Sequence, residues 1–268
     1  MKPLLLLATR AEDAAADNEY EAFLGFAGLS EGDLRRVRLE QRALGDVDLR
    51  DWSGILVGGG PFNYSEPAER KSPVQRRVEA ELLGLLDRVV SADFPFLGAC
   101  YGIGLLGHHE GAVVDRRYAE PVGRVQVTLT PAGRHDALLG GLPAAFDAFV
   151  GHKEAISELP GHAVRLASSP GCPVQAFRIG SNVYATQFHP ELDAQGLCTR
   201  IDVYRHAGYF EPEEAGELKA LAYRSEVIHP PELLRRFVQR YAADVGGSDL
   251  SAPSAVAMGS PAAAGGCC

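Results

Sequence analysis

The stretch Pro95-Phe96-Leu97-Gly98-Ala99-Cys100-Tyr101-Gly102-Ile103-Gly104-Leu105-Leu106 decides the fold of this 268-residue chain. Its first half is an apolar run that predicts a buried strand, and its second half begins an apolar helical pattern. Gly98 and Gly102 flank Cys100 where the two meet. A sharp turn from strand to helix needs glycine on both sides of the turn residue, because side chains there would collide. The stretch therefore predicts an elbow that projects a thiol at a helix N-terminus, where the helix dipole favours the thiolate.

Around this elbow, short apolar runs alternate with helical patterns, which is typical of strand–helix–strand units around a parallel sheet. The predicted strands are residues 4–8, 54–57 and 94–99. Apolar residues recur at helical spacing through residues 74–89, which predicts a crossover helix. A shorter helix is expected over residues 18–26, with Asp17 or Asn18 as its cap.

The second half of the chain has a different pattern. Val125, Val127 and Leu129 alternate with polar residues, and residues 174–179 and 183–188 flank a Gly-Ser-Asn turn, which predicts a hairpin. Three helical stretches follow, at residues 197–206, 212–223 and 231–243. We therefore expect an α/β fold in which helices flank a mostly parallel central sheet, with an antiparallel extension and C-terminal helices.

The domain organisation follows from these patterns. One domain is expected over residues 1–195, and a helical extension packed on the same domain over residues 196–245. In residues 246–268, Ala, Gly, Ser and Pro supply 17 of 23 residues, which is too little apolar mass to offset the entropy of ordering. This tail is predicted to be disordered.

Composition narrows the class of protein. The formal net charge is −9, so neither nucleic acid nor an anionic membrane is an expected partner. The apolar run of residues 3–8 is too short to span a bilayer. The five cysteines, at positions 100, 172, 198, 267 and 268, show neither metal-ligand spacing nor a disulfide framework. We therefore expect a cytoplasmic protein without a metal site.

A second motif supplies partners for the thiol. In Ala185-Thr186-Gln187-Phe188-His189-Pro190-Glu191, His189 and Glu191 are two residues apart and point to the same side of an extended segment. A histidine can act as base for Cys100 and as acid for a leaving group, while a carboxylate orients the ring. Cys100, His189 and Glu191 are therefore the predicted catalytic triad.

A third motif is Ile55-Leu56-Val57-Gly58-Gly59-Gly60-Pro61, a strand that ends in glycines. Acyl transfer needs backbone N–H donors close to the developing oxyanion, and a glycine loop lets the main chain approach. A tight turn at the end of a strand explains the same glycines equally well.

Together these motifs resemble the class I glutamine amidotransferase domain, a flavodoxin-like fold, and in particular the stand-alone branch similar to the glutaminase half of GMP synthase. The matching stretches are GGGP at 58–61, GACYG at 98–102 and QFHPE at 187–191. The resemblance implies that Cys100 is the nucleophile, that His189 is the general base and acid, and that Glu191 orients it. It also implies an oxyanion hole from the backbone N–H groups of Gly60 and Tyr101.

The resemblance also implies the reaction. The thiolate attacks the side-chain amide of glutamine, ammonia leaves, and water releases glutamate from a γ-glutamyl thioester without any cofactor. Gly59, His152 and Lys153 are the substrate-binding residues that it suggests, since Phe149–Glu154 resembles the stretch that lines the glutamine pocket. A separate synthetase subunit is the implied partner.

One position departs from the family. A glutamine usually stands four residues after the nucleophile, but here that position is Gly104. The larger pocket that results favours an alternative, a γ-glutamyl peptidase or hydrolase that uses the same triad on γ-glutamyl amides. A third alternative is a non-catalytic regulatory subunit on the same fold.

Overall fold

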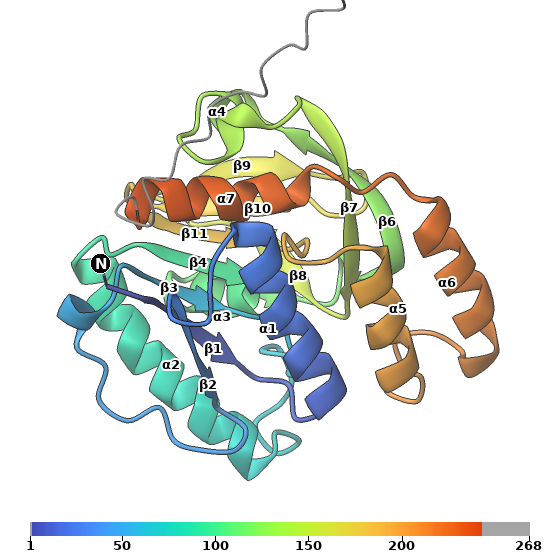
Figure 1. The fold of residues 1–268 in the computed structure, drawn as a ribbon, viewed down its shortest axis with the longest axis horizontal. Coiled ribbons are helices and arrows are strands. Elements are labelled where there is room, and N and C mark those ends of the chain that lie inside the picture. Colours follow the sequence, from blue (N-terminus) through green and yellow to red (C-terminus); the bar gives the residue numbers. More distant parts are fainter. Residues whose placement is uncertain (1, 243–268) are drawn as a thin grey trace, which may run out of the picture.

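The computed structural model describes residues 2–242, in which most strands join one twisted sheet (Figure 1). Its strands are β1 Leu4–Ala8, β2 Leu34–Arg38, β3 Gly54–Val57, β4 Phe96–Ala99, β6 Glu120–Leu129, β7 Ala145–His152, β9 Val164–Ser168, β10 Ala176–Ile179 and β11 Val183–Thr186. Within the described range the strand order is β2-β1-β3-β4-β11-β10-β9-β6-β7, and β5 Val113–Asp115 pairs separately with β8 Ala155–Glu158.

The sheet has a parallel and an antiparallel half. The pairs β1–β2, β1–β3, β3–β4 and β4–β11 are parallel, whereas the pairs from β11 through β10, β9 and β6 to β7 are antiparallel. The predicted α/β fold with an antiparallel extension is confirmed, and so is the hairpin, which β10 and β11 form around Gly180.

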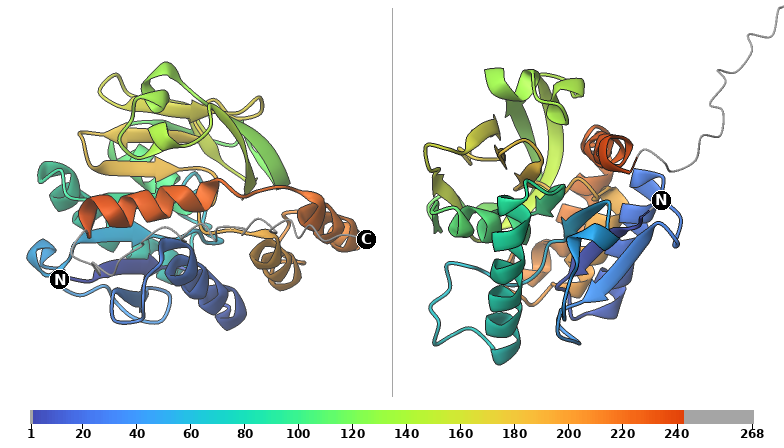
Figure 2. Two further views of the ribbon diagram at one scale, coloured as in Figure 1. Left: turned by 45° about the horizontal axis from the view of Figure 1, so that its top comes forward. Right: turned by 90° about the vertical axis from the view of Figure 1, so that its left-hand side faces the viewer.

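Helices cover both faces of the parallel half (Figures 1 and 2). The helices are α1 Asp13–Ala27, α2 Pro73–Ser91, α3 Tyr101–His109, α4 Pro131–Arg134, α5 Ala194–Val203, α6 Ala215–Arg224 and α7 Pro230–Tyr241, with short 3₁₀ turns at Leu49–Asp51, Leu139–Gly141 and Pro212–Glu214. Successive residues of β1 point to opposite faces. Leu4 and Leu6 therefore pack with α1 and α7, while Leu5 and Leu7 pack with α2 and α3.

Two local predictions differ from the structure. Helix α1 begins at Asp13, with Glu12 as its N-cap residue, so Asp17 and Asn18 lie inside the helix and the predicted cap is wrong. The run of alanines at 14–16 has the strongest helix propensity and extends the helix toward the N-terminus. Strand β2, Leu-Arg-Arg-Val-Arg, was not predicted, because it is an edge strand with charged side chains and lacks an apolar run.

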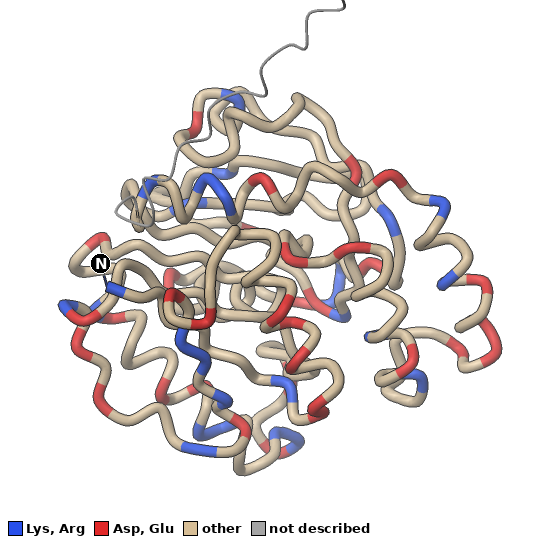
Figure 3. Tube along the Cα trace, viewed as in Figure 1, with Lys and Arg blue, Asp and Glu red and all other residues tan. Residues whose placement is uncertain are grey.

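The C-terminal part forms the three predicted helices, each shifted by up to three residues. Helix α7 lies along α1, and α5 packs against both α1 and α6. The predicted tail, 246–268, lies outside the described residues. Within those residues, the helices are all too short or too polar to cross a membrane. Acidic and basic positions are interspersed along the described chain (Figure 3).

Candidate active site

Cys100 occupies the elbow between β4 and α3 that its flanking glycines predict. It is the N-cap residue of α3 with φ 51° and ψ −91°, one of two non-glycine residues of the described chain with positive φ. A Cβ on Gly98 would lie 2.9 Å from the carbonyl oxygen of Gly102. The Cys100 N–H donates to the Thr186 carbonyl at 2.8 Å, which ties the elbow to β11. Such backbone strain costs about 1–3 kcal/mol and is concentrated at functional sites.

His189 lies beside Cys100 because their strands are parallel neighbours. The pairing of β4 with β11 places Ala99 opposite Thr186, so the residues after both strands leave the same edge of the sheet. Both side chains line one hollow, and the charge of Cys100 raises the pKa of His189. His189 Nδ1 lies 2.8 Å from Glu191 Oε1. The structure thus brings the three residues of the predicted triad together, with His189 and Glu191 both buried.

The surrounding charges set the protonation of this pair. Burial lowers the pKa of His189, but the charge of Glu191 and then that of Cys100 outweigh burial and hold the pKa above its usual value. For Glu191, burial raises the pKa, yet His189 and Arg200 together hold it well below its usual range. An ionised Glu191, 2.8 Å from Nδ1, favours the tautomer of His189 that carries its proton on Nδ1.

Arg200, on helix α5, was not among the predicted site residues. Its Nη2 lies 2.9 Å from Glu191 Oε1 and 3.6 Å from Glu19 Oε1, and its Nη1 lies 3.0 Å from His189 Nδ1. It is only 6% exposed. This arginine therefore holds the carboxylate that orients the histidine.

A second buried arginine continues the network. Arg10 Nε lies 3.0 Å from Glu19 Oε1, and Arg10 Nη1 donates to the Tyr204 hydroxyl at 3.2 Å. Two arginines and two glutamates are thus paired beneath the triad, as burial of charge requires. Arg10 follows the first parallel strand, and sites form at the carboxyl ends of such strands. Its position in the sequence could therefore have predicted it as a site residue. No comparable signal marks Arg200.

The glycine loop after β3 is pressed against these groups. A Cβ on Gly58 would lie 2.5 Å from Glu19 Oε2, and one on Gly60 would collide with Thr9 Oγ1. A Cβ on Gly59 would lie 2.5 Å from His189 Cε1 and 2.8 Å from Arg10 Nη2. Gly59, predicted to bind substrate, therefore lies against the His189 ring, and all three glycines are required by close approach.

We expect Gly59→Ala to lower kcat by about 100-fold, because the methyl group would displace the His189 ring by an ångström or so. The matched control is Gly84→Ala on α2, where a Cβ meets nothing within 4 Å. That variant should keep its activity and gain stability from alanine's helix propensity. Steady-state kinetics and thermal unfolding of both variants provide the test. A wild-type kcat in Gly59→Ala would show that a methyl group at position 59 does not displace the His189 ring.

Two hollows meet at the Cys100 thiol. The first, called the Glu154 hollow, is lined by Gly60, Tyr101, Gly104, Glu154 and Gln187 among others. The second, called the Leu197 hollow, lies on the His189 side. Both predicted oxyanion residues, Gly60 and Tyr101, border the first. Tyr101 is the first residue of α3, where backbone N–H groups have no partner inside the helix.

Glu154 was also missed by the sequence analysis. The Glu154 residue is 8% exposed, and its carboxylate accepts the backbone N–H groups of Tyr64 and Ser65, both at 2.7 Å. A Cβ on Gly104 would lie 3.1 Å from Glu154 Oε1. The missing side chain at position 104 therefore leaves a buried carboxylate facing the hollow.

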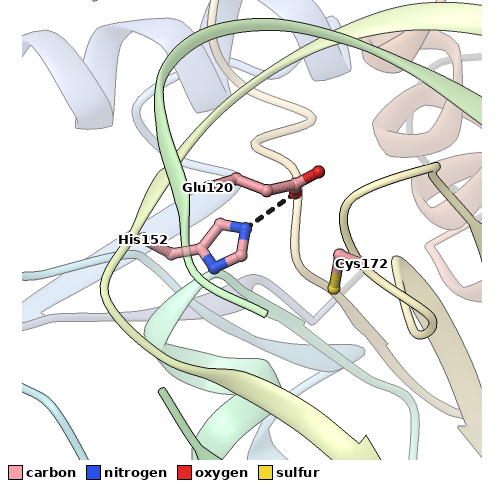
Figure 4. A group of neighbouring side chains, drawn as sticks. All are labelled: Glu120, His152 and Cys172. Carbon is pink, nitrogen blue, oxygen red and sulfur yellow. Dashed lines mark hydrogen bonds and ion pairs between the residues drawn. The ribbon is translucent and has the colours of Figure 1, made fainter. Parts of the chain in front are cut away.

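His152, which also lines the Glu154 hollow, belongs to a buried cluster with Glu120 and Cys172 (Figure 4). Its Nδ1–H donates to the Glu154 carbonyl at 2.8 Å and its Nε2 lies 2.9 Å from Glu120 Oε2. Glu120 also accepts bonds from Ser169 and Gln175, and burial raises the pKa of the Cys172 thiol to about 12. Protein groups already satisfy this carboxylate and this ring, so the cluster holds the end of β7 that presents Glu154.

Lys153, the other predicted substrate residue, borders the Glu154 hollow and also contacts the segment after α5. Its Nζ donates to the Ala207 carbonyl at 2.6 Å and lies 4.2 Å from the centroid of the Tyr209 ring. Tyr209 borders both hollows. Lys153 thus connects β7 to the segment after α5 that closes over the thiol.

Comparison with known proteins adds a family to this geometry. The model of the family "Glutamine amidotransferase class-I" matches residues 33–197. The chain is 33% identical over 150 residues to the GMP synthase of Aeropyrum pernix, a match that covers 56% of this chain and 26% of that protein. The match thus spans about a quarter of that longer protein. The chain is also 28% identical over 152 residues to a glutamine-hydrolysing GMP synthase subunit of Thermoplasma acidophilum, covering 55% and 69% of the two chains.

Solved structures give the same fold over more of the chain. A glutamine amidotransferase from Thermotoga maritima aligns with a TM-score of 0.72 at 22% identity, covering 90% of this chain and 99% of that one. One from Methylobacillus flagellatus aligns with a TM-score of 0.67 at 18% identity, covering 91% and 95%. The fold likeness therefore covers more of the chain than the family model, which matches residues 33–197.

Proposed function

Since the chain belongs to the class I glutamine amidotransferase family, we propose that it hydrolyses the side-chain amide of glutamine through a γ-glutamyl thioester on Cys100. The observation that carries this proposal is the strained Cys100 elbow beside the buried His189–Glu191 pair. The family resemblance drawn from the three motifs is confirmed by the match, and it includes cysteine-dependent chemistry.

The Glu154 hollow suits the acyl half of the substrate. Its buried carboxylate can pair with the α-ammonium group of glutamine. The amide carbonyl then reaches Cys100, and its oxygen faces the N–H groups of Gly60 and Tyr101, which border the same hollow.

The bonds that form and break in the reaction then involve Cys100 and His189. The thiolate forms a bond to the amide carbon, and the protonated His189 gives its Nε2 proton to the nitrogen as the C–N bond breaks and ammonia leaves. His189 next takes a proton from water, whose oxygen attacks the thioester carbon. The C–S bond breaks, glutamate is released, and the thiol is restored.

Ammonia released in this way needs a consumer. The Thermoplasma relative is one subunit of a glutamine-hydrolysing GMP synthase, which supports a proposal that this chain also supplies ammonia to a separate synthetase chain. The free thiols of Cys100, Cys172 and Cys198 fit a reducing compartment, and cytoplasmic location is part of the same proposal.

The test is release of glutamate and ammonia from L-glutamine by the purified chain, with intact-protein mass spectrometry for the γ-glutamyl adduct. Glu154→Gln should raise KM by about 10- to 100-fold, since a charge-assisted bond to the ammonium group is lost. Glu158→Gln, an exposed carboxylate on the neighbouring strand, is the matched control and should leave KM unchanged. Absence of both turnover and adduct would refute the proposed function.

A further inference from the structure

In the hydrolysis of free glutamine the leaving group is ammonia, which has no substituent to occupy the Leu197 hollow. We propose that it binds the amine half of N-substituted γ-glutamyl amides, and that the favoured substituent is an apolar alkyl group. This inference rests on the proposed thioester chemistry at Cys100 and extends it to a substrate class.

The two hollows determine which half of the substrate lies on each side of Cys100. Gly60, Cys100, Gly151 and Tyr209 border both of them, so the hollows join at the thiol. The glutamyl half lies on the Glu154 side. The nitrogen that leaves must face His189, which protonates it, and His189 lines only the Leu197 hollow of the two. A substituent on that nitrogen therefore enters the Leu197 hollow.

The wall of this hollow sets the chemistry of the substituent. Its apolar side chains are Val122, Val150, Leu192, Leu197, Ile201 and Phe210. The two cations in the wall, Arg10 and Arg200, are paired with Glu19 and Glu191. Because these charges are already balanced, an alkyl group fits the wall better than a carboxylate. Each methylene removed from water is expected to raise kcat/KM about fourfold until the space is filled.

Much of the wall comes from outside the region that the family model matches. Ile201 lies on the last turns of α5, and Phe210 and Tyr209 follow that helix, beyond residue 197 where the match ends. Lys153 anchors this segment through the Ala207 carbonyl and the Tyr209 ring. The amine side of the site is thus built by the chain's own C-terminal segment.

The test measures kcat/KM for L-glutamine, γ-glutamyl-methylamide, γ-glutamyl-isobutylamide and γ-glutamylglycine. The last two differ in that an isopropyl group in the isobutylamide is replaced by a carboxylate in γ-glutamylglycine. We expect isobutylamide to exceed methylamide by at least tenfold and to exceed γ-glutamylglycine by a similar factor. If the chain hydrolyses glutamine, but its kcat/KM for the isobutylamide is less than a tenth of its kcat/KM for glutamine, this inference is overturned. The proposed function is then still supported. Turnover of no substrate would overturn both.

A pair of variants locates the effect. Leu197→Phe should fill the hollow and lower the ratio of isobutylamide to glutamine kcat/KM at least tenfold. Leu221→Phe, on the exposed side of α6, is the matched control and should leave that ratio unchanged. If Leu197→Phe does not fold, Leu197→Ala serves instead, since a larger hollow should shift the preference toward longer amides. An unchanged ratio in the folded variant would contradict this assignment of the hollow.

Discussion

Cys100→Ala is expected to lower amide hydrolysis by about 10⁶-fold, because it removes the sulfur atom that forms the thioester while keeping the backbone hydrogen bond from residue 100 to Thr186. The change removes one sulfur atom from a half-buried position, so the thermal unfolding midpoint should stay close to that of the wild type. Glutamate release and thermal unfolding of the same preparation check both expectations.

His189→Ala should lower activity to the same floor, and the double variant should fall no further, since the thiol and the ring act as a unit. Cys198→Ala, which removes another free thiol from helix α5, is the matched control and should retain activity. A double variant that loses much more than either single one would show that the two residues act separately.

Arg200→Met has the second largest expected effect, on stability as well as on rate. Removing one partner of a buried charge cluster leaves Glu191 and Glu19 less compensated, which costs about 3–5 kcal/mol of unfolding free energy. Activity should fall by about 10- to 100-fold, because the carboxylate that orients His189 loses its own anchor. Chemical denaturation and steady-state kinetics measure the two losses.

The pKa of His189 distinguishes an electrostatic role of Arg200 at the site from a general loss of stability. Arg200 lowers the pKa of His189, so Arg200→Met should raise it, whereas Glu191→Gln should lower it. The raised pKa of folded His189 means that protonation stabilises the fold at acidic pH, and that this contribution is lost as pH rises through the folded pKa. In Arg200→Met the stabilising contribution of protonated His189 should be lost at higher pH than in the wild type. NMR titration of the His189 ring measures the pKa that sets this pH.

Two further variants serve as controls for Arg200. Arg200→Lys keeps the charge but not the two-point contact, so it should recover most of the stability and part of the rate. Arg205→Met removes a more exposed arginine just beyond the end of α5, paired only with Asp202 among the described residues, and should change neither. If Arg200→Met left the pKa of His189 where it is, a direct electrostatic role would be refuted.

Local sequence determined much of this protein by itself. The glycines around Cys100 specify the elbow, because backbone collision is a property of neighbouring residues, and the apolar run of residues 4–8 specifies a buried strand. His189 and Glu191 are in contact, as their two-residue spacing suggests, but they lie in the turn after β11, so the predicted extended segment is wrong. These features depend on contacts close in the chain, so a linear pattern reveals them.

Tertiary structure alone decided the rest of the site. Arg200 meets Glu19 across 181 positions, and Glu154 meets Tyr64 across 90, so no local spacing predicts either contact. Edge strand β2 also depends on its neighbour, since its charged sequence forms a strand only when β1 supplies hydrogen bonds. The Leu197 hollow exists because helix α5 and the segment after it fold back over Cys100. A buried charge is stable only when an opposite charge is buried beside it, and here the partners come from segments far apart in the chain. No single stretch of sequence contains both partners, so none of them predicts these features.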